Sequence, residues 1–313
     1  MLAAYLTKLG LSDPFDGLEV GERPGPPARE GWEIISVKAA TANPHDLWTL
    51  RGVVGVPIEP PLILGCDGAG IDSRGREVVI HSVVSTGEKF RMLTDGVDGT
   101  FAAKVAIPAG HTVPKPPHLS FEEAAGLGTA WLTAWRMLFT KARLLPGERL
   151  LVQGGGGGVA TAAIILGSAA GAHVTVTSRR PEMLERVLAI GAHEAVSTGS
   201  RLSERVDVVI ETVGAPTWSH SLASLRYGGR IVVAGATAGH EVTSDLRRVF
   251  FREVSVLGST MGTLDELKAL CAFVTQAELR PPVEQVYEGI ERVPDALRAL
   301  DEGKVFGKVA VKI

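Results

Sequence analysis

The chain has 313 residues, 45% of them hydrophobic and 21% charged, which is typical of a globular protein with a sizeable core and a length that favours two domains. Its formal net charge is −3, and it has neither a long basic run nor an apolar stretch long enough to span a bilayer, so we expect neither nucleic acid nor a membrane as a partner. Cys66 and Cys271 are too few for a disulfide framework, and the first residues do not resemble a signal peptide, so we expect a reducing, cytoplasmic location.

Roughly the first 120 residues have the pattern of short strands and turns, interrupted by clusters of Gly and Pro. We expect a strand within residues 32–40 and a surface loop at the Pro- and Gly-rich segment 21–31. Near Ser120 the pattern changes. Two glutamates and then apolar residues follow this serine, which is typical of a helix start with acidic residues in its first turn.

From residue 149 onward, strand and helix patterns alternate. We expect strands at 149–153, 173–177, 194–196, 206–212, 229–234 and 254–258, and helices at 159–170 and 181–190, each helix followed by a glycine. This spacing predicts an α/β fold with a doubly wound parallel sheet. A helix at 264–277 and a strand at 308–313 follow, and this tail is too short to fold alone, so we expect it to rejoin the N-terminal domain.

Five consecutive glycines, residues 154–158, stand between the first of these strands and the next helix. Read from Gly155, the run matches the pattern G-x-G-x-x-G/A with Ala160 third, whereas the register from Gly154 fails. Such a turn lets the backbone approach a pyrophosphate, and the helix N-terminus offers free N–H groups to it. The predicted cofactor contacts are Gly155, Gly156, Gly157, Gly158 and Val159. The alternative is a flexible glycine loop without a ligand.

Two arginines stand where the second strand of this unit is expected to end. Proteins that bind NAD usually place Asp or Glu about 20 residues after the turn, to hold the ribose hydroxyls. This chain has Ser178, Arg179 and Arg180 instead. A carboxylate repels a 2′-phosphate, whereas a guanidinium binds one with charge-assisted hydrogen bonds. The segment therefore predicts NADPH rather than NADH, and the alternative is a solvated basic turn.

Several stretches of the chain resemble the medium-chain dehydrogenase/reductase superfamily, and in particular its zinc-free quinone-oxidoreductase-like branch. They are VKAATANPHD at 37–46, PLILGCDGAG at 61–70, LPGE at 145–148 before the glycine turn, GGRIV at 228–232, LGSTMG at 257–262 and GKV at 307–309. No single stretch is decisive, but their order and spacing are specific, and they cover nearly the whole chain.

The resemblance implies a GroES-like, mostly-β catalytic domain of residues 1–123 and 261–313, interrupted by a Rossmann domain at 124–260, with a small-molecule substrate between them. It also implies a homodimer, often joined through the last Rossmann strand, here 253–258. The Asn-Pro-x-Asp signature of the family corresponds to Asn43, Pro44 and Asp46. Further cofactor contacts correspond to Val213, Gly214, Ala234, Gly235, Ala236 and Lys308.

Zinc-dependent relatives hold their catalytic metal with a Cys, a His and a second Cys or Asp, near a Glu. By the same correspondence, Asn43 replaces the first Cys, Cys66 and Asp67 replace the His-Glu pair, and Thr129 falls near the last ligand position. Asn and Thr are poor zinc ligands, and one thiol does not build the set of N and S ligands that zinc prefers. We therefore expect no metal.

Without a metal to polarise a carbonyl, acceptors that are already electrophilic are favoured, namely quinones, enones and enals. Asn43, Thr129 and Thr133 are the candidate hydrogen-bond donors to the oxygen that becomes negative, and all three are expected to line the cleft. Trp48 is a candidate wall for a flat substrate. These residues have simpler explanations too: Asn43 braces a loop, the threonines bond back to helix carbonyls, and Trp48 belongs to the core.

Asp46 and Cys66 are weaker candidates for the substrate site. Asp46 is expected to orient a loop rather than to act as a base, and Cys66 is either a thiol in the cleft or small buried packing. The segment 43–57 has no tyrosine, where enoyl-thioester reductases of the superfamily carry a proton donor, so we expect the final proton to come from water.

Three functions remain in competition. The first is an NADPH-dependent reductase of quinones or α,β-unsaturated carbonyl compounds, which we prefer. The second is a reductase of a larger thioester or secondary-metabolite intermediate. The third is a non-catalytic NADPH-binding protein, such as a redox sensor.

Overall fold

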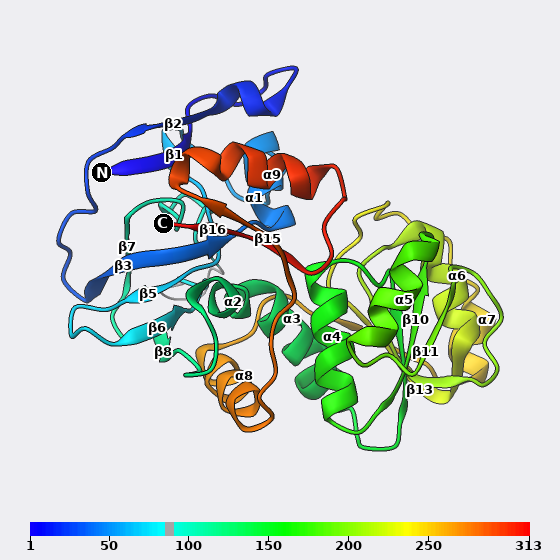
Figure 1. The fold of residues 1–313 in the computed structure, drawn as a ribbon. Helices are drawn as coiled ribbons and strands as arrows, with labels where there is room; N and C mark the ends of the chain where they lie inside the picture. Colours follow the sequence, from blue (N-terminus) through cyan, green and yellow to red (C-terminus); the bar gives the residue numbers. More distant parts are fainter. Residues whose placement is uncertain (85–90) are drawn as a thin grey trace. The chain divides into compact units, whose positions relative to one another are not determined.

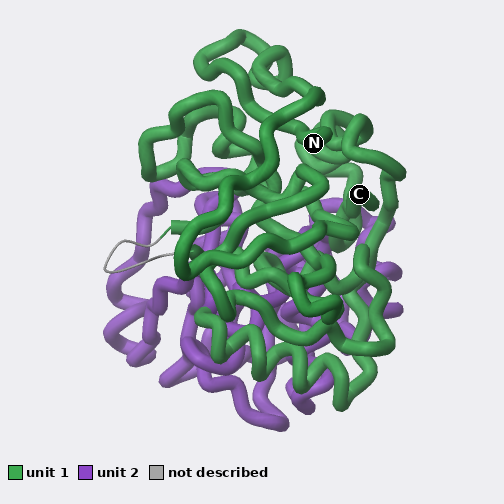
Figure 2. The backbone as a smooth tube through the Cα atoms, turned by 90° about the vertical axis from the view of Figure 1, so that its left-hand side faces the viewer, with its two compact units in different colours: residues 1–130, 263–313 green, residues 131–262 purple. Residues whose placement is uncertain are grey.

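The computed structural model describes residues 1–84 and 91–313. These residues form two compact units (Figure 2): unit 1 contains residues 1–130 and 263–313, and unit 2 contains residues 131–262. The domain limits that the resemblance implies, at 123/124 and 260/261, remain a proposal.

Unit 2 is built on a sheet of six parallel strands in the order β11-β10-β9-β12-β13-β14. Its strands are β9 (Arg149–Gln153), β10 (His173–Ser178), β11 (Glu194–Ser197), β12 (Val206–Glu211), β13 (Leu225–Val233) and β14 (Ser255–Gly258). Its helices are α3 (Leu132–Trp135), α4 (Gly158–Ala169), α5 (Pro181–Ala189), α6 (Ala215–Ser224) and α7 (Leu246–Phe251), with a π-helix, η3 (Arg136–Lys141). Helices flank this sheet (Figure 1), so the predicted α/β class with a doubly wound parallel sheet is confirmed.

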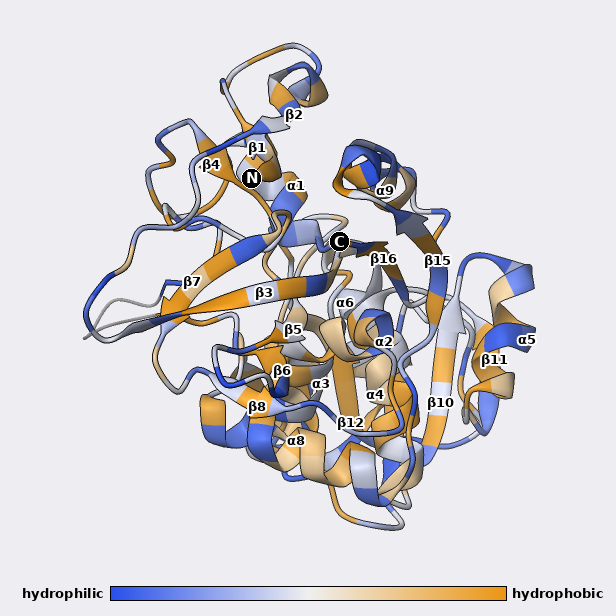
Figure 3. Cartoon of the chain, turned by 60° about the vertical axis from the view of Figure 1, so that its left-hand side comes forward, coloured by the Kyte–Doolittle hydropathy of each residue, from blue (hydrophilic) through white to orange (hydrophobic). Residues whose placement is uncertain are grey.

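The strands of unit 2 form where short apolar runs are buried on both faces of the sheet. Leu150, Leu151 and Val152 of β9 are fully buried, and β9 pairs with β10 on one side and β12 on the other. Figure 3 shows the hydrophobic character of the neighbouring β12. The strand predicted at 229–234 begins earlier, at Leu225, which pairs with Val206; the exposed segment 226–228 lies in the register shift before the next pair, Val208 and Arg230.

Unit 1 contains two further sheets. A three-stranded sheet has the order β2-β1-β4, and a seven-stranded sheet has the order β15-β16-β3-β5-β6-β8, with β7 also paired to β3. The strands are β1 (Leu2–Leu6), β2 (Leu18–Glu22), β3 (Trp32–Thr41), β4 (Leu62–Ile63), β5 (Ala69–Ile71), β6 (Glu77–Ile80), β7 (Lys104–Pro108), β8 (Thr112–Pro114), β15 (Val283–Glu288) and β16 (Lys308–Lys312). The helices are α1 (Pro44–Arg51), α2 (Phe121–Ala125), α8 (Leu264–Gln276) and α9 (Val293–Asp301), with 3₁₀ turns η1 (Pro14–Gly17) and η4 (Ile290–Arg292); a π-helix, η2 (Leu127–Trp131), ends one residue beyond the unit.

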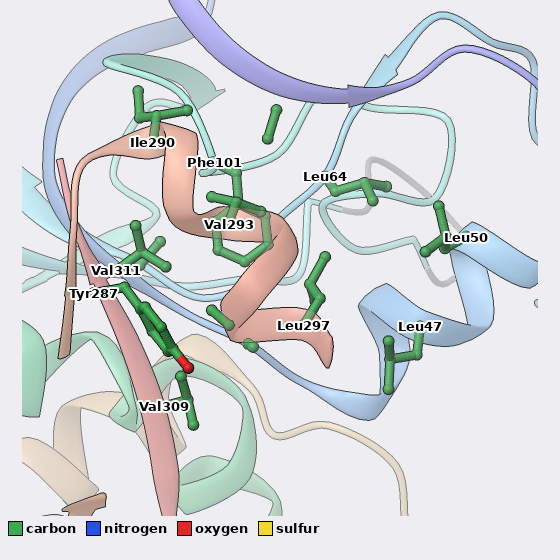
Figure 4. Packing of buried hydrophobic residues seen from close by; sticks show 14 of the residues in the cluster. Leu47, Leu50, Leu64, Phe101, Tyr287, Ile290, Val293, Leu297, Val309 and Val311 are labelled. Atoms are coloured by element: carbon green, nitrogen blue, oxygen red, sulfur yellow. The ribbon is translucent and has the colours of Figure 1, made fainter. Parts of the chain in front are cut away.

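The C-terminal residues 263–313 belong to the unit formed by the N-terminal residues. Strand β16 pairs antiparallel with β3, with Ala310 opposite Thr41, and Ala42 N donates to Val309 O at 3.0 Å. Figure 4 shows part of the shared core, a cluster that contains Phe101 and side chains of α1, α9 and β16. This register brings the start of β16, where Lys308 stands, to the end of β3, which precedes Asn43.

Two expected helix boundaries are also observed. Ser120 precedes α2 and accepts a hydrogen bond from Glu123 N, while the Glu123 carboxylate accepts one from Ser120 N. Gly191 follows α5 with φ +111°, a conformation that favours glycine. Across residues 1–84 and 91–313, no helix combines the length and the hydropathy needed to cross a membrane.

Candidate functional site

Asn43 stands at the turn between β3 and α1, where extended backbone meets the helix that starts at Pro44. Its backbone N–H donates to Asp46 Oδ2 at 2.8 Å, which fixes the first turn of α1. Its side chain points inward and is 2% exposed. The amide nitrogen donates to Thr41 O at 3.1 Å and to Asp67 Oδ2 at 2.8 Å, so both amide hydrogens are used within the protein.

Four buried side chains form what we call the Lys308 cluster: Thr41, Asn43, Asp67 and Lys308. The Lys308 ammonium donates to Asn43 Oδ1 at 2.5 Å, to Ala42 O at 3.0 Å and to Asp67 Oδ2 at 3.2 Å. Thr41 Oγ1 donates to the same Asp67 oxygen at 2.8 Å. Lys308 is 3% exposed and Asp67 is fully buried, so the two charges compensate each other inside unit 1.

Asp46 and Cys66 lie beside this cluster. Burial raises the pKa of Asp46 to about 6, from an ordinary value of 3.8, although Asn43 N and Gly65 N both donate to its carboxylate. Burial also raises the pKa of the Cys66 thiol well above its usual range. The thiol packs 3.9 Å from Asp46 Oδ2 and 3.8 Å from Thr129 Oγ1, and it is fully buried.

Thr129 is half-buried, and the contacts of its hydroxyl with the described residues are long. Its hydroxyl lies 3.2 Å from Ser82 Oγ and 3.5 Å from Cys66 O. Its proton is therefore weakly held and is free to turn toward a ligand. Thr133, by contrast, belongs to unit 2, is 8% exposed and faces the sulfur of Met261 at 3.5 Å.

The positions that correspond to zinc ligands in relatives meet inside unit 1, but their chemistry does not fit zinc. Asn43 is engaged through both amide hydrogens, Asp67 is paired with an ammonium, and the Cys66 thiol is held in its protonated form by burial. Within residues 1–84 and 91–313, no three His, Cys, Asp or Glu side chains are placed to hold a metal ion together.

Trp48 lies apart from the cluster on the exposed side of α1. It is 38% exposed, and its ring meets that of His45 edge-on at 6.4 Å between centroids. His45 is in turn held by Asp95, with Nε2 and Oδ1 3.0 Å apart. The indole therefore offers an accessible apolar surface rather than a core side chain.

The glycine turn of unit 2 has the geometry that a close ligand requires. Gly154 has φ +77°, and the N–H groups of Gly154 and Gly155 both donate to Thr177 O, which ties the turn to the end of β10. A Cβ at Gly155 would lie 2.6 Å from Val176 Cγ1, so this position is closed. A Cβ at Gly157 would meet nothing within 4 Å, so the face at the start of α4 is open.

The Ser178–Arg180 segment begins with the last residue of β10. Ser178 Oγ accepts from Arg180 N at 3.1 Å, which shapes the turn into α5. Arg180 is half-buried and its Nε lies 4.0 Å from Glu182. Arg179 is exposed, and in the part of the chain that the structure describes its guanidinium has no hydrogen bond or ion pair. Arg179 is thus the guanidinium that is available to an external anion.

The remaining predicted cofactor contacts of unit 2 lie after β12 and β13. Ala238 N donates to Val213 O at 2.8 Å and Ala234 N to Glu211 O at 3.2 Å, so the segments 213–214 and 234–236 run side by side. Gly214 has φ +95°, and a Cβ there would lie 2.1 Å from Gly239 O. Lys308, in contrast, belongs to unit 1 and points into its buried cluster.

Sequence reasoning missed three buried polar residues in this region: Gln153, Thr177 and Glu211. Each is the last or second-last residue of its strand, immediately before a predicted ligand segment or one residue away from it. A polar side chain closing an otherwise apolar strand is the signal that would have found them, since such a group is kept only where it has hydrogen-bond partners.

Comparison with known proteins adds the following. Residues 158–276 match the zinc-binding dehydrogenase family. A zinc-type alcohol dehydrogenase-like protein of Schizosaccharomyces pombe is 29% identical over 96% of this chain and 96% of its own length. The quinone oxidoreductase of Mus musculus is 32% identical over 74% of this chain and 72% of its own.

Solved structures resemble the whole chain. A NAD-dependent alcohol dehydrogenase has a TM-score of 0.93 and 33% identity, with both chains covered completely. The quinone oxidoreductase of Thermus thermophilus, solved alone and with NADPH, has a TM-score of 0.84 and 31% identity, again with both chains covered completely.

Proposed function

Because the chain belongs to the medium-chain dehydrogenase/reductase superfamily, whose members are oxidoreductases with GroES-like and Rossmann domains, we propose that it is a zinc-independent, NADPH-dependent reductase of small molecules. Its substrates are quinones or α,β-unsaturated carbonyl compounds. The proposal covers the cofactor, the substrate class and the lack of a metal.

One observation carries the substrate class. The carboxylate of Asp67, at a position that corresponds to the metal environment of relatives, is compensated by the Lys308 ammonium. A site without a Lewis acid gives little activation to an isolated carbonyl or alcohol. Conjugated acceptors need less activation, because the carbon that receives hydride is already electrophilic.

The glycine turn and Arg179 support the choice of cofactor. The open face at Gly157 and the start of α4 offer room and free N–H groups to a pyrophosphate. The exposed Arg179 guanidinium suits a 2′-phosphate. The two similar structures differ here, one being described as NAD-dependent and the other being solved with NADPH. The exposed Arg179 favours NADPH as the cofactor of this chain.

When bound, reduced nicotinamide supplies the hydride. The oxygen of the acceptor then becomes negative and needs a donor, and we assign this role to Thr129, whose hydroxyl makes long contacts to Ser82 and Cys66. Asn43 acts by bracing the turn before α1, because its amide hydrogens are already donated. Trp48 gives an apolar surface for a flat substrate. Water supplies the final proton.

We also propose that the protein is a homodimer joined through β14. This strand is the edge of the parallel sheet, so one side of its backbone is unpaired within unit 2. Val256 on this strand is 48% exposed, and Phe250 and Phe251 just before it are 60% and 72% exposed. Pairing with β14 of a second copy would continue the sheet and cover these side chains.

A panel of acceptors tests the function. The protein is treated with EDTA, its zinc content is measured, and NADPH absorbance is followed with 9,10-phenanthrenequinone, a 2-alkenal, a cyclic enone and crotonyl thioester, and in reverse with NADP⁺ and a series of alcohols. We expect turnover of the quinone or an enone by the metal-free protein. Activity restricted to the thioester favours the second function, and tight NADPH binding without any turnover favours a redox sensor. Stoichiometric zinc, or alcohol oxidation that EDTA abolishes, contradicts the proposal.

A further inference from the structure

Three strands of unit 2 carry a buried polar side chain at their last or second-last residue: Gln153 on β9, Thr177 on β10 and Glu211 on β12. All three are fully buried. Each stands next to a segment that we assign to the cofactor: the glycine turn, the Ser178–Arg180 segment and the Val213–Gly214 segment. The three strands are neighbours in the sheet, in the order β10-β9-β12.

A hydrogen-bond chain connects the first two of these ends. Thr177 Oγ1 donates to Gln153 Oε1 at 2.6 Å. This contact fixes the orientation of the Gln153 amide, so its nitrogen faces the other way, 3.0 Å from Ser221 Oγ and 2.9 Å from His220 Nδ1. Since the amide nitrogen only donates, His220 Nδ1 is the acceptor, and Nε2 donates to Ser200 O at 2.8 Å.

Ser221 continues the chain to the third strand end. Its hydroxyl donates to Glu211 Oε2 at 2.6 Å. Glu211 Oε1 in turn accepts from Val213 N at 2.9 Å and Gly214 N at 3.1 Å, and Thr217 Oγ1 lies within 2.9 Å of both carboxylate oxygens. The buried carboxylate is thus solvated by two amides and two hydroxyls, all of them neutral donors.

We propose that Gln153 and Glu211 are positioning residues that hold the three cofactor-binding segments in register. Neither residue needs to touch the cofactor. A buried network in which every member has a partner is rigid, and Glu211 anchors the two amides of a segment whose conformation at Gly214 is restricted to glycine. Loss of the network would leave the strands in place but release the segments at their ends, which lowers the affinity for the cofactor.

This inference rests on the proposed function, and it makes a separate prediction. We expect NADPH and NADH to share most of the contacts with the segments that the network holds. Loss of the network should therefore lower the affinity for both cofactors by the same factor. Loss of the Arg179 side chain, in contrast, should lower the affinity for NADPH alone.

The test is a fluorescence titration of NADPH and NADH against the full chain and three variants. Glu211→Met keeps the size of the side chain but leaves Val213 N and Gly214 N without their acceptor, and we expect about a tenfold rise in both dissociation constants. In Glu211→Gln the side-chain oxygen still accepts from these two amides, and the side-chain nitrogen donates to hydroxyls that can rotate to accept. Both dissociation constants of this variant should therefore lie within about threefold of the wild-type values.

Asp207→Leu is the matched control. Asp207 is a buried carboxylate on the same strand but at the opposite end, where it accepts from Arg149 N at 2.7 Å and pairs with Arg226. Its loss should lower the melting temperature and leave both dissociation constants unchanged. If Glu211→Met does not fold, Ser221→Ala removes the link between the two halves of the network and should raise both constants about threefold.

The outcomes separate the two proposals. Wild type that binds neither nucleotide contradicts the proposed function and this inference with it. Wild type that binds NADPH, together with a folded Glu211→Met or Ser221→Ala variant that binds equally well, contradicts the inference alone. So does an Asp207→Leu variant that weakens binding as much as Glu211→Met.

Discussion

Lys308 Nζ lies 3.2 Å from Oδ2 of Asp67, and both side chains are buried although 241 residues separate them in sequence. The pairing of β16 with β3 brings the lysine to the turn at Asn43, whose amide donates to the same carboxylate. An ammonium thus compensates the buried carboxylate of Asp67, a residue that by resemblance corresponds to the metal environment of zinc-dependent relatives. The ion pair between Lys308 and Asp67 is the reason that we propose quinones and α,β-unsaturated carbonyl compounds as hydride acceptors.

Removal of the ammonium should therefore be costly. Lys308→Met leaves the Asp67 carboxylate buried without its cation, and we expect the free energy of unfolding to fall by about 3–5 kcal/mol. The double variant Lys308→Met/Asp67→Asn removes both charges and should recover at least about 1 kcal/mol of that loss. Urea denaturation measures both values. A double variant less stable than the single one would show that the pair is not compensating.

The pH dependence of stability should carry a contribution from Asp46. Its pKa is about 6 in the folded protein and 3.8 ordinarily, so the folded state holds the proton more tightly. This stabilisation is complete below pH 4 and is lost as the pH rises to about 6, a loss of up to about 3 kcal/mol. The stability advantage of wild type over Asp46→Asn should shrink over this range in urea denaturation. A stability difference between wild type and Asp46→Asn that stays constant or grows with pH would contradict the raised pKa of Asp46.

Arg179→Ala should lower the affinity for NADPH by about 10- to 100-fold, because charge-assisted hydrogen bonds to the 2′-phosphate contribute about 1.5–3 kcal/mol. The affinity for NADH, which lacks this phosphate, should not change. Arg201→Ala is the control, since it removes an exposed arginine elsewhere in unit 2. Equal losses for both nucleotides, or for both variants, would remove the argument for NADPH.

Two glycine substitutions should separate folding from binding. Gly157→Ala adds a methyl group where nothing lies within 4 Å, so stability should change by less than about 1 kcal/mol while NADPH affinity falls at least about tenfold. Gly155→Ala places its Cβ against Val176 and should destabilise the fold directly. Thermal denaturation and nucleotide titration measure the two effects. If Gly157→Ala binds NADPH as tightly as wild type does, the pyrophosphate does not bind at this turn.

Val256→Asp should convert the dimer to a monomer, because it puts a charge on the edge strand that we assign to the interface. Light scattering coupled to size-exclusion chromatography measures the mass. Val242→Asp, an exposed position of unit 2 outside β14, serves as control and should stay dimeric. A wild-type monomer, or a dimer that survives Val256→Asp, would place the interface elsewhere or remove it.

The parallel sheet was the most predictable part of the fold. Residues 150–152 and 208–210 are short, continuous apolar runs that are buried in the sheet, and β9 was predicted at its observed bounds and β12 to within one residue. Strands of unit 1 such as β5 and β7 are short and antiparallel, and no local pattern distinguishes them from turns.

The site was predictable only where chemistry is local. The glycine turn and Arg179 follow directly from consecutive residues. The contact between Lys308 and Asp67, and the chain from Thr177 to Glu211, depend on pairings between distant segments. Lys308 was assigned to the cofactor by resemblance, whereas its side chain lies in the buried cluster of unit 1.

The most direct test of the account is a crystal structure of the metal-stripped protein with NADPH. We expect the pyrophosphate at the N–H groups of residues 156–159, the 2′-phosphate in contact with Arg179, and the Lys308 ammonium still bonded to Asp67 with no ion beside it. An unliganded glycine turn, or a zinc ion bound by Cys66 and Asp67, would contradict the account.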